Sequence, residues 1–349
     1  MKKFECLAVG SVPHKSLDKA MSLVKENFSQ IPFWPQMVKI DKNEDMIVQF
    51  TQNMPSFFSD GDKIYLETES DEFFGDLETF FEHYGKIVKS GNDKVLENYA
   101  VGYSLAFEPF IEIVRETKPA YAKGQITGPF TLSAALTDKA GRCALYDETL
   151  REIIVKTLSL KAIWQIKRIK AASPETTPVI FIDEPSVSQL GTSAFLTISA
   201  EEVTGMIKEV SDLIQENGAL SAIHCCGKFD WALPVNAGVN IINFDAYAQN
   251  PAVFHSEIKR FLENGGKIAW GVVPTLDKDA LQKADLQQMI RVFENGVKNL
   301  TAKGINEKII LDNSLVTPSC GAGGLSEELA QKAMSLTCQL SKALRANSD

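Results

Sequence analysis

The sequence predicts an α/β fold in which eight parallel strands and their helices form a closed (β/α)8 barrel, a TIM barrel. Eight short runs rich in β-branched and aromatic residues recur, and most are separated by an amphipathic, helix-like stretch. Such alternation is typical of a parallel sheet, and eight is the strand number of a closed barrel. The expected strands are residues 7–12, 63–68, 120–127, 178–183, 220–225, 240–245, 267–273 and 308–312.

One domain is expected to span residues 1–349. Barrels of this class routinely exceed about 250 residues as a single unit. The chain has no internal repeat, low-complexity tract or Gly/Ser linker that would mark a second domain. In its first third, residues 19–62 and 70–119 each have room for more than one helix. These are expected to be helical insertions above the barrel mouth.

Composition limits the classes of partner. The net charge of −9 argues against nucleic acid or an anionic membrane surface as the main partner. No run approaches the ~18 apolar residues that cross a bilayer, and the apolar stretch after Glu5 is too short for a signal peptide. We therefore expect a cytoplasmic protein, in which the six cysteines stay reduced.

Soft metal ligands stand at the ends of two expected strands. His224 and Cys226 are two residues apart, so they face one side of a strand while Cys225 faces the other. Cys320 lies beyond the last expected strand, and the carboxyl ends of barrel strands meet at one mouth. Imidazole with thiolates suits Zn²⁺. We therefore predict a zinc site at His224, Cys226 and Cys320, whereas the other cysteines are expected to be inert apolar residues.

Two carboxylates follow neighbouring strands of the predicted barrel. Asp245 ends its strand at the height of the His–Cys pair and is a candidate fourth zinc ligand, the alternative being a helix cap. Asp183, followed by Glu184 and Pro185, is placed over the mouth, where a carboxylate would bind an ammonium group. The alternative for Asp183 is again a cap, with Pro185 opening the next helix. The two neighbouring acids could divide these roles.

Taken together, these motifs resemble the C-terminal catalytic domain of cobalamin-independent methionine synthase. That family lies in a larger group with uroporphyrinogen decarboxylase and the methylcobalamin:thiol methyltransferases. The resemblance covers nearly the whole chain in order. The matching segments are residues 9–13, 127–129, 182–185, 224–226 and 318–321.

The resemblance implies a zinc-dependent methyltransferase that methylates the thiol of homocysteine to give methionine. His224, Cys226 and Cys320 would bind zinc and take part in catalysis. The family's fourth ligand is a glutamate on the next strand, where this chain has Asp245. The substrate's amino-acid group would be bound by Ser11, by Asp183 and by the acid after the second strand. An alignment without a gap makes that acid Glu69, and Glu67 is the alternative.

The resemblance also bears on the methyl donor. The folate-dependent enzymes resemble a duplicated pair of barrels, and the segment after the seventh expected strand lacks the family's histidine. We therefore expect a methylated corrinoid, either methylcobalamin or a corrinoid protein, rather than methyltetrahydrofolate. Three alternatives stay open. They are methylation of another thiol such as coenzyme M, a uroporphyrinogen decarboxylase-like enzyme, and a structural zinc site in a module that binds a corrinoid protein.

Overall fold

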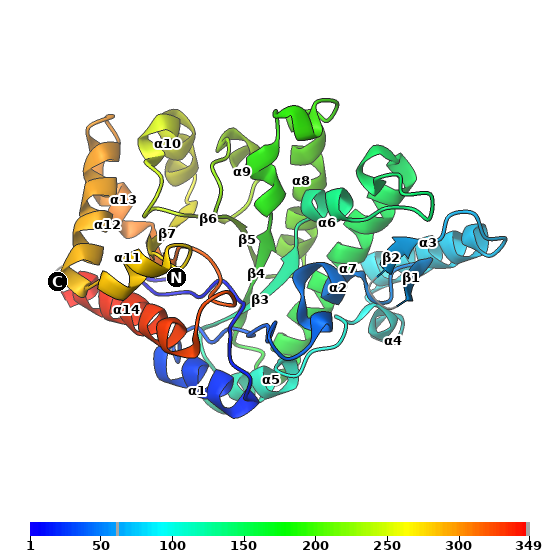
Figure 1. The fold of residues 1–349 in the computed structure, drawn as a ribbon, viewed down its shortest axis with the longest axis horizontal. Helices are drawn as coiled ribbons and strands as arrows, with labels where there is room; N and C mark the ends of the chain where they lie inside the picture. Colours follow the sequence, from blue (N-terminus) through cyan, green and yellow to red (C-terminus); the bar gives the residue numbers. More distant parts are fainter. Residues whose placement is uncertain (61–62, 347–349) are drawn as a thin grey trace.

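The computed structural model describes residues 1–60 and 63–346, and these form an α/β fold around a curled parallel sheet (Figure 1). Among the described residues this sheet has six strands in the order β3-β4-β5-β6-β7-β8, each parallel to the next. Helices lie around the outside of the strands (Figure 1). The strands are β3 Tyr121–Thr127, β4 Thr177–Asp183, β5 Leu220–Cys225, β6 Ile241–Phe244, β7 Lys267–Val273 and β8 Ser314–Pro318.

The helices follow the alternation that the sequence predicts over most of the chain. The α-helices are α1 Leu17–Asn27, α2 Met46–Thr51, α3 Phe73–Ser90, α4 Asp93–Leu96, α5 Phe107–Thr117, α6 Pro129–Ala135, α7 Glu148–Ala172, α8 Ala200–Glu216, α9 Ala232–Asn236, α10 His255–Glu263, α11 Lys278–Lys283, α12 Leu286–Thr301, α13 Glu307–Asp312 and α14 Glu327–Ala346. Short 3₁₀ helices lie at Lys42–Glu44, Glu97–Tyr99, Ala144–Tyr146, Pro185–Gln189, Ser193–Phe195 and Pro251–Phe254. In the described part of the chain, no helix is long and apolar enough to cross a membrane.

Two extended segments lie between the edges of the sheet. The first extended segment, residues 4–12, bonds to β8, with Leu7 N–H donating to the Val316 carbonyl at 3.0 Å. The second extended segment, residues 32–37, exchanges hydrogen bonds with both the first segment and β3, and Trp34 N–H donates to the Lys123 carbonyl at 3.0 Å. Both segments form isolated bridges rather than strands. The structure thus has a six-stranded sheet whose edges are connected, not the regular eight-stranded barrel that we expected.

Besides residues 7–12, which form isolated bridges, two further expected strands are wrong. Residues 63–68 do not join the parallel sheet, because β2 Lys63–Leu66 pairs antiparallel with β1 Phe57–Asp60 in a separate hairpin. Residues 308–312 form helix α13, whose start is capped by Asn306 Oδ1 accepting from Lys308 N–H at 2.9 Å. A short apolar run fits a strand or a buried helix equally well. The last strand, β8, therefore begins at Ser314, two residues after the end of the segment we expected.

Side chains at alternate positions fill the interior of the curled sheet below the site. This inner cluster is buried and apolar and contains Leu7, Ile31, Val179, Phe181, Ala222, Ile241, Ala269 and Leu315. Asp183, His224 and Asn243 follow Phe181, Ala222 and Ile241 at the same two-residue spacing. The three polar side chains therefore lie directly above the inner cluster, at the carboxyl ends of β4, β5 and β6.

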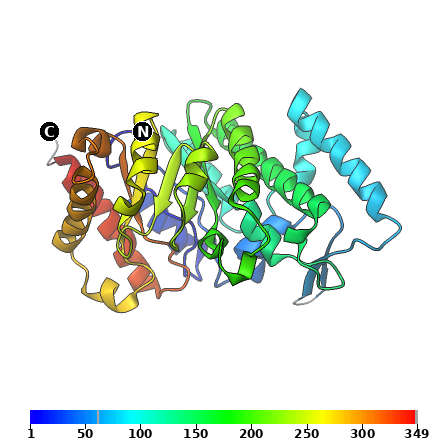
Figure 2. The same cartoon turned by 90° about the horizontal axis from the view of Figure 1, so that it is seen from above.

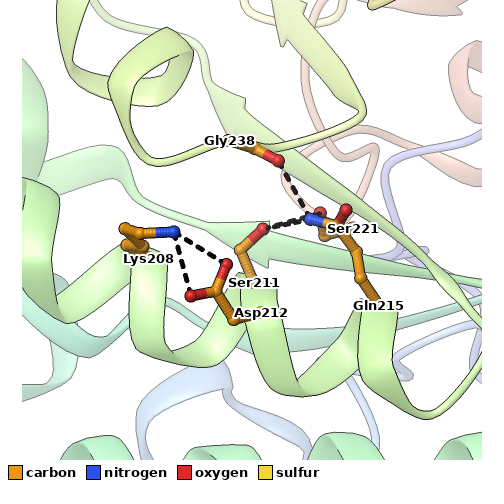
Figure 3. Close-up of polar contacts among 6 residues, drawn as sticks. All are labelled: Lys208, Ser211, Asp212, Gln215, Ser221 and Gly238. Atoms are coloured by element: carbon orange, nitrogen blue, oxygen red, sulfur yellow. Dashed lines mark hydrogen bonds and ion pairs between the residues drawn. The ribbon is translucent and has the colours of Figure 1, made fainter.

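At the opposite, amino-terminal end of β5, a polar network joins the strand to helix α8 (Figure 3). Gln215 of α8 donates to Ser211 and Ser221 at 2.9 and 3.1 Å and to the Gly238 carbonyl at 2.9 Å. Lys208 and Asp212 pair on the exposed face of the same helix. Since Ser221 stands near the start of β5, this network fixes α8 against the strand that carries His224 at its far end.

The first third contains the helical insertions that the sequence predicts. Helix α3 and the β1–β2 hairpin extend to one side of the sheet in both views (Figures 1 and 2). Helix α14 and the first extended segment lie beside each other at the other side, where Ser341 of α14 donates to the Phe4 carbonyl at 2.5 Å. The first and last elements therefore support one another beside β8.

Candidate metal centre

Three soft ligands come together at the carboxyl ends of β5 and β8. One ligand atom from each of His224, Cys226 and Cys320 lies within 4.8 Å of the other two. His224 is the second-last residue of β5, and Cys226 directly follows this strand. Cys225 points the other way, into the core between sheet and helices. The alternation that distinguished Cys226 from Cys225 is confirmed by this placement.

The orientation of His224 is set by Asn243 on the neighbouring strand β6. The Asn243 amide nitrogen donates to the Ala269 carbonyl at 2.8 Å and to Thr317 Oγ1 at 2.7 Å. A carbonyl only accepts, so this contact fixes which end of the amide is nitrogen. Asn243 Oδ1 then accepts from His224 Nδ1–H at 2.6 Å. The imidazole proton is therefore on Nδ1, and the lone pair is on Nε2.

Among the described residues, His224 Nε2 is buried and has no nitrogen or oxygen hydrogen-bond partner, and Cys226 is the neighbouring group that interacts with it electrostatically. Buried polar atoms without partners are uncommon, and this one is a nitrogen lone pair beside two sulfurs. The sulfurs are electrostatically unequal: a hydrogen bond from Cys320, followed by His224, lowers the pKa of Cys226, whereas the same bond raises the pKa of Cys320. Cys226 is thus the sulfur that ionises first. An imidazole with a ready thiolate and a second thiol fits Zn²⁺, which prefers sulfur and nitrogen ligands.

Asp245 does not belong to this group of ligands. Its Oδ1 accepts hydrogen bonds from the N–H groups of Tyr247 and Ala248, both at 3.0 Å. The carboxylate therefore caps the turn after β6, which was the alternative role that the sequence left open. The protein supplies three clustered ligands among the described residues, and a tetrahedral ion would have one further position.

Asp183 and Glu184 have separate roles. Glu184 is fully buried and accepts from the N–H groups of Phe130 and Thr131 at 2.9 Å and from the Thr131 hydroxyl at 2.6 Å. It thereby caps the start of α6, the helix before it rather than the one after it. Asp183 faces the cavity instead. Its Oδ1 is buried and has no hydrogen-bond partner in the described part of the chain, and burial raises the pKa of this carboxyl against the opposing effect of Lys123.

The cavity above the inner cluster has a volume of about 310 Å³ and contains the ligand group. Its lining combines residues from both extended segments with the ends of β4, β5 and β8. The lining residues are Val9, Ser11, Gln36, Val38, Asp45, Met46, Asp183, Pro185, His224, Cys226, Cys320, Gly321, Gly323 and Gly324. A space of this size suits a small molecule rather than a macromolecular segment. Ser11, Asp183 and the three metal-ligand candidates therefore share one site.

The acids expected after the second strand lie elsewhere. The Glu69 side chain is 65% exposed and lies 3.9 Å from Arg142, and Glu67 forms an ion pair with Lys139 at 2.8 Å. Neither acid lines the cavity. The reason is that residues 63–68 form part of the hairpin, while the second extended segment occupies the place beside β3.

Gln36 and Asn243 are site residues that the sequence analysis missed. Asn243 precedes Asp245 by two residues, so strand alternation alone would have placed it on the ligand side. Gln36 lies next to Pro35 and after Pro32, and these prolines made its segment look like a loop. The prolines are tolerated because the bonds to β3 and to the first segment use the N–H groups of Trp34 and Gln36.

The fold and the site define an α/β protein with a candidate soft-metal centre at the carboxyl edge of its parallel sheet. Its fold is similar to that of a B12-independent methionine synthase from Shewanella sp. W3-18-1, solved in complex with selenomethionine. That similarity has a TM-score of 0.51 with 14% sequence identity and covers 71% of this chain and 70% of the other. A D-psicose 3-epimerase solved with D-fructose matches with a TM-score of 0.39 and 10% identity over 75% of this chain and 93% of the other. No protein-family model matches the chain, and no curated protein matches its sequence.

Proposed function

We propose that the protein is a zinc-dependent methyltransferase that methylates the thiol of homocysteine to give methionine. The observation that carries the proposal is the position of His224, Cys226 and Cys320 in one small cavity with the unpartnered carboxylate Asp183. A thiol-binding metal and an ammonium-binding acid are the two features that an amino-acid thiol needs. The fold similarity to a methionine synthase agrees with this assignment.

The chain's own residues would hold the metal and leave one position open. His224 Nε2, Cys226 Sγ and Cys320 Sγ would be the protein ligands, with Asn243 keeping the imidazole in the required tautomer. Zn²⁺ supplies Lewis acidity that lowers the pKa of a coordinated thiol, so that a thiolate is present at neutral pH. Because the thiol would already be present as a thiolate, the protein would need no general base to deprotonate it.

The rest of the cavity would orient the amino-acid end of homocysteine. Asp183 offers a buried carboxylate for the substrate ammonium group. Ser11 Oγ accepts from Gly323 N–H at 3.3 Å, which leaves the hydroxyl proton free to donate to the substrate carboxylate. Asp183 ends β4 and Ser11 lies on the first extended segment, and both line the cavity. Together they would place the thiol toward the sulfur ligands.

The proposed donor is a methylated corrinoid, either methylcobalamin or a corrinoid protein. The support for this donor is that the sequence resembles the family but lacks the family's folate-associated features. Coenzyme M is a less suitable acceptor, because a sulfonate requires basic groups and no lysine or arginine is among the residues that line the cavity. For a uroporphyrinogen decarboxylase-like enzyme the same lack of basic residues is unfavourable, since that substrate is an acidic tetrapyrrole.

The test is methionine formation by the purified protein with zinc, homocysteine and either methylcobalamin or methyltetrahydrofolate. Methionine from methylcobalamin is expected, and it should be lost in Cys226→Ala. The matched control is Cys225→Ala, because Cys225 is the adjacent thiol but points into the core. Methionine from methyltetrahydrofolate alone would overturn the donor assignment. Full activity in Cys226→Ala would overturn the role of the metal centre.

A further inference from the structure

We infer that Gln36 is a specificity-determining residue that recognises the amino group of the substrate through its side-chain oxygen. The inference rests on the proposed function, because it concerns the acceptor bound in the same cavity. Gln36 lies on the second extended segment, lines the cavity and is 5% exposed. It is therefore a largely buried polar side chain that borders the space for the substrate.

A chain of hydrogen bonds fixes the orientation of the Gln36 amide. The amide nitrogen of Gln49 in α2 donates to the Tyr103 carbonyl at 3.0 Å. A backbone carbonyl has no proton to donate, so the atom of Gln49 beside it must be nitrogen. Gln49 Oε1 is consequently the acceptor for Gln36 Nε2, which lies 2.8 Å away. The Gln36 oxygen is then the free end of the side chain.

The network behind Gln49 is itself buried and held in place. Glu44 is fully buried and accepts from Leu105 N–H at 2.7 Å and from Met37 N–H and Gln49 Nε2 at 3.3 Å. Gln49 is also fully buried. Rotation of the Gln36 amide would place its oxygen against Gln49 Oε1, so that two acceptors would be in contact inside this network. The acceptor at Gln36 is thus preorganised rather than selected by the ligand.

Asp183 Oδ1 is a buried acceptor without a donor among the described residues, and Gln36 Oε1 is the second acceptor of a side chain that lines the same cavity. Gly10 lies beside this oxygen, and a Cβ at that position would come within 3.3 Å of Gln36 Oε1. An ammonium group carries three N–H donors and could donate to both acceptors, whereas a ligand without an amine would donate to neither and would leave Asp183 Oδ1 unpaired. The glutamine adds an acceptor to the site without a second negative charge beside Asp183 and the thiolates.

The experiment compares two thiols that differ only in the amino group, homocysteine and 4-mercaptobutanoate. Each is titrated into the Co²⁺-substituted protein without methyl donor, and the thiolate-to-metal absorption reports binding. In Gln36→Met, the affinity for homocysteine is expected to fall about ten- to a hundredfold, the usual cost of an unmade buried hydrogen bond. The affinity for 4-mercaptobutanoate should change less than about threefold. Gln282→Met, at an exposed position of α11, is the matched control.

Equal losses for both thiols, or no loss for homocysteine, would overturn the role of Gln36. Gln49→Met is the second variant: it keeps Gln36 but removes the acceptor that orients it, and a smaller loss confined to homocysteine is expected. If Gln36→Met does not fold, as judged by circular dichroism, the comparison of the two thiols in Gln49→Met decides the question alone. Because binding is measured without a donor, a protein that distinguishes the thiols but makes no methionine would contradict the proposed function and not this inference.

Discussion

The Nδ1 atom of His224 lies 2.6 Å from the Oδ1 atom of Asn243. The two residues are register partners on adjacent parallel strands, so the contact comes from the sheet itself rather than from a loop. Asn243 is in turn held by the Ala269 carbonyl on β7 and by Thr317 on β8. Through this one amide, three strands determine which imidazole nitrogen faces the sulfur ligands.

Replacement of Asn243 by alanine should weaken zinc binding by about ten- to a hundredfold, the usual effect of losing such a supporting contact. The imidazole would then lose the acceptor that keeps its proton on Nδ1. A competitive titration with a chromophoric chelator measures the affinity. Asn243→Asp retains an acceptor for His224 and should lose less. Unchanged affinity in Asn243→Ala would show that the histidine is oriented by other contacts.

Removal of zinc should lower the melting temperature of the wild-type protein. Cys226 and Cys320 follow β5 and β8, so a bound ion would crosslink two separate parts of the sheet. A shift of several degrees is expected in differential scanning fluorimetry with and without chelator. Cys320→Ala should melt at the same temperature in both conditions. A chelator effect of equal size in that variant would place the stabilising metal elsewhere.

Gly128→Ala should destabilise the protein by about 1–3 kcal/mol, as expected for overpacking of a tight site. A Cβ at Gly128 would overlap the Glu184 carboxyl group, which three hydrogen bonds hold at the start of α6. Urea unfolding measures the change. Gly205→Ala, in the middle of α8, is the control, because a Cβ there meets nothing within 4 Å. That control should stabilise by about 0.5–1 kcal/mol through helix propensity.

The stability of the protein should rise with pH because of Lys161. This lysine is fully buried, donates to the carbonyls of Gln52 and Ala100 at 2.6 and 2.8 Å, and has its pKa lowered by burial to about 7. An unfolded lysine has a pKa near 10.4. Between these values the unfolded chain binds the extra proton, so the free energy of unfolding increases by up to about 1.4 kcal/mol per pH unit. Below pH 7 the contribution no longer changes.

Lys161→Met should remove this dependence. Urea unfolding of both proteins at pH 7.5, 8.5 and 9.5 should show that wild type gains stability relative to the variant as the pH rises. Lys208→Met serves as the control, since Lys208 is exposed on α8 beside Asp212. If the wild-type and Lys161→Met curves run parallel, Lys161 is protonated in the folded protein.

Strand alternation predicted which side chains lie together at the carboxyl ends of the strands, because it is a local rule. It separated Cys226 from Cys225, and the convergence of strand ends brought Cys320 to the same place. Strands β3 to β7 lie close to their expected bounds for the same reason. The placement of the second extended segment, residues 32–37, beside β3 could not be predicted in this way. Its hydrogen bonds avoid the nitrogens of two prolines, and that depends on tertiary pairing rather than on any local pattern.

The substrate-binding acids illustrate the same limit. Glu69 was inferred on the assumption that residues 63–68 form a strand of the parallel sheet. Because this segment forms a separate hairpin instead, Glu69 lies exposed and away from the cavity. Asp245 stands where alternation placed it, yet two backbone N–H groups after β6 occupy its carboxylate oxygen. A pattern of apolar and polar residues does not predict which backbone N–H groups will donate to a side chain. Asp183 lines the cavity, and its neighbour Glu184 takes the capping role.

The order of the ligands along the chain has a consequence for biosynthesis. His224 and Cys226 leave the ribosome together, but Cys320 and the strand that positions it follow much later. Until β8 bonds to the first extended segment, a nascent chain has an imidazole and one thiolate without the second sulfur. If the group binds metal as proposed, we expect the protein to acquire the ion only after translation of β8, so that metal binding would indicate that the fold is complete.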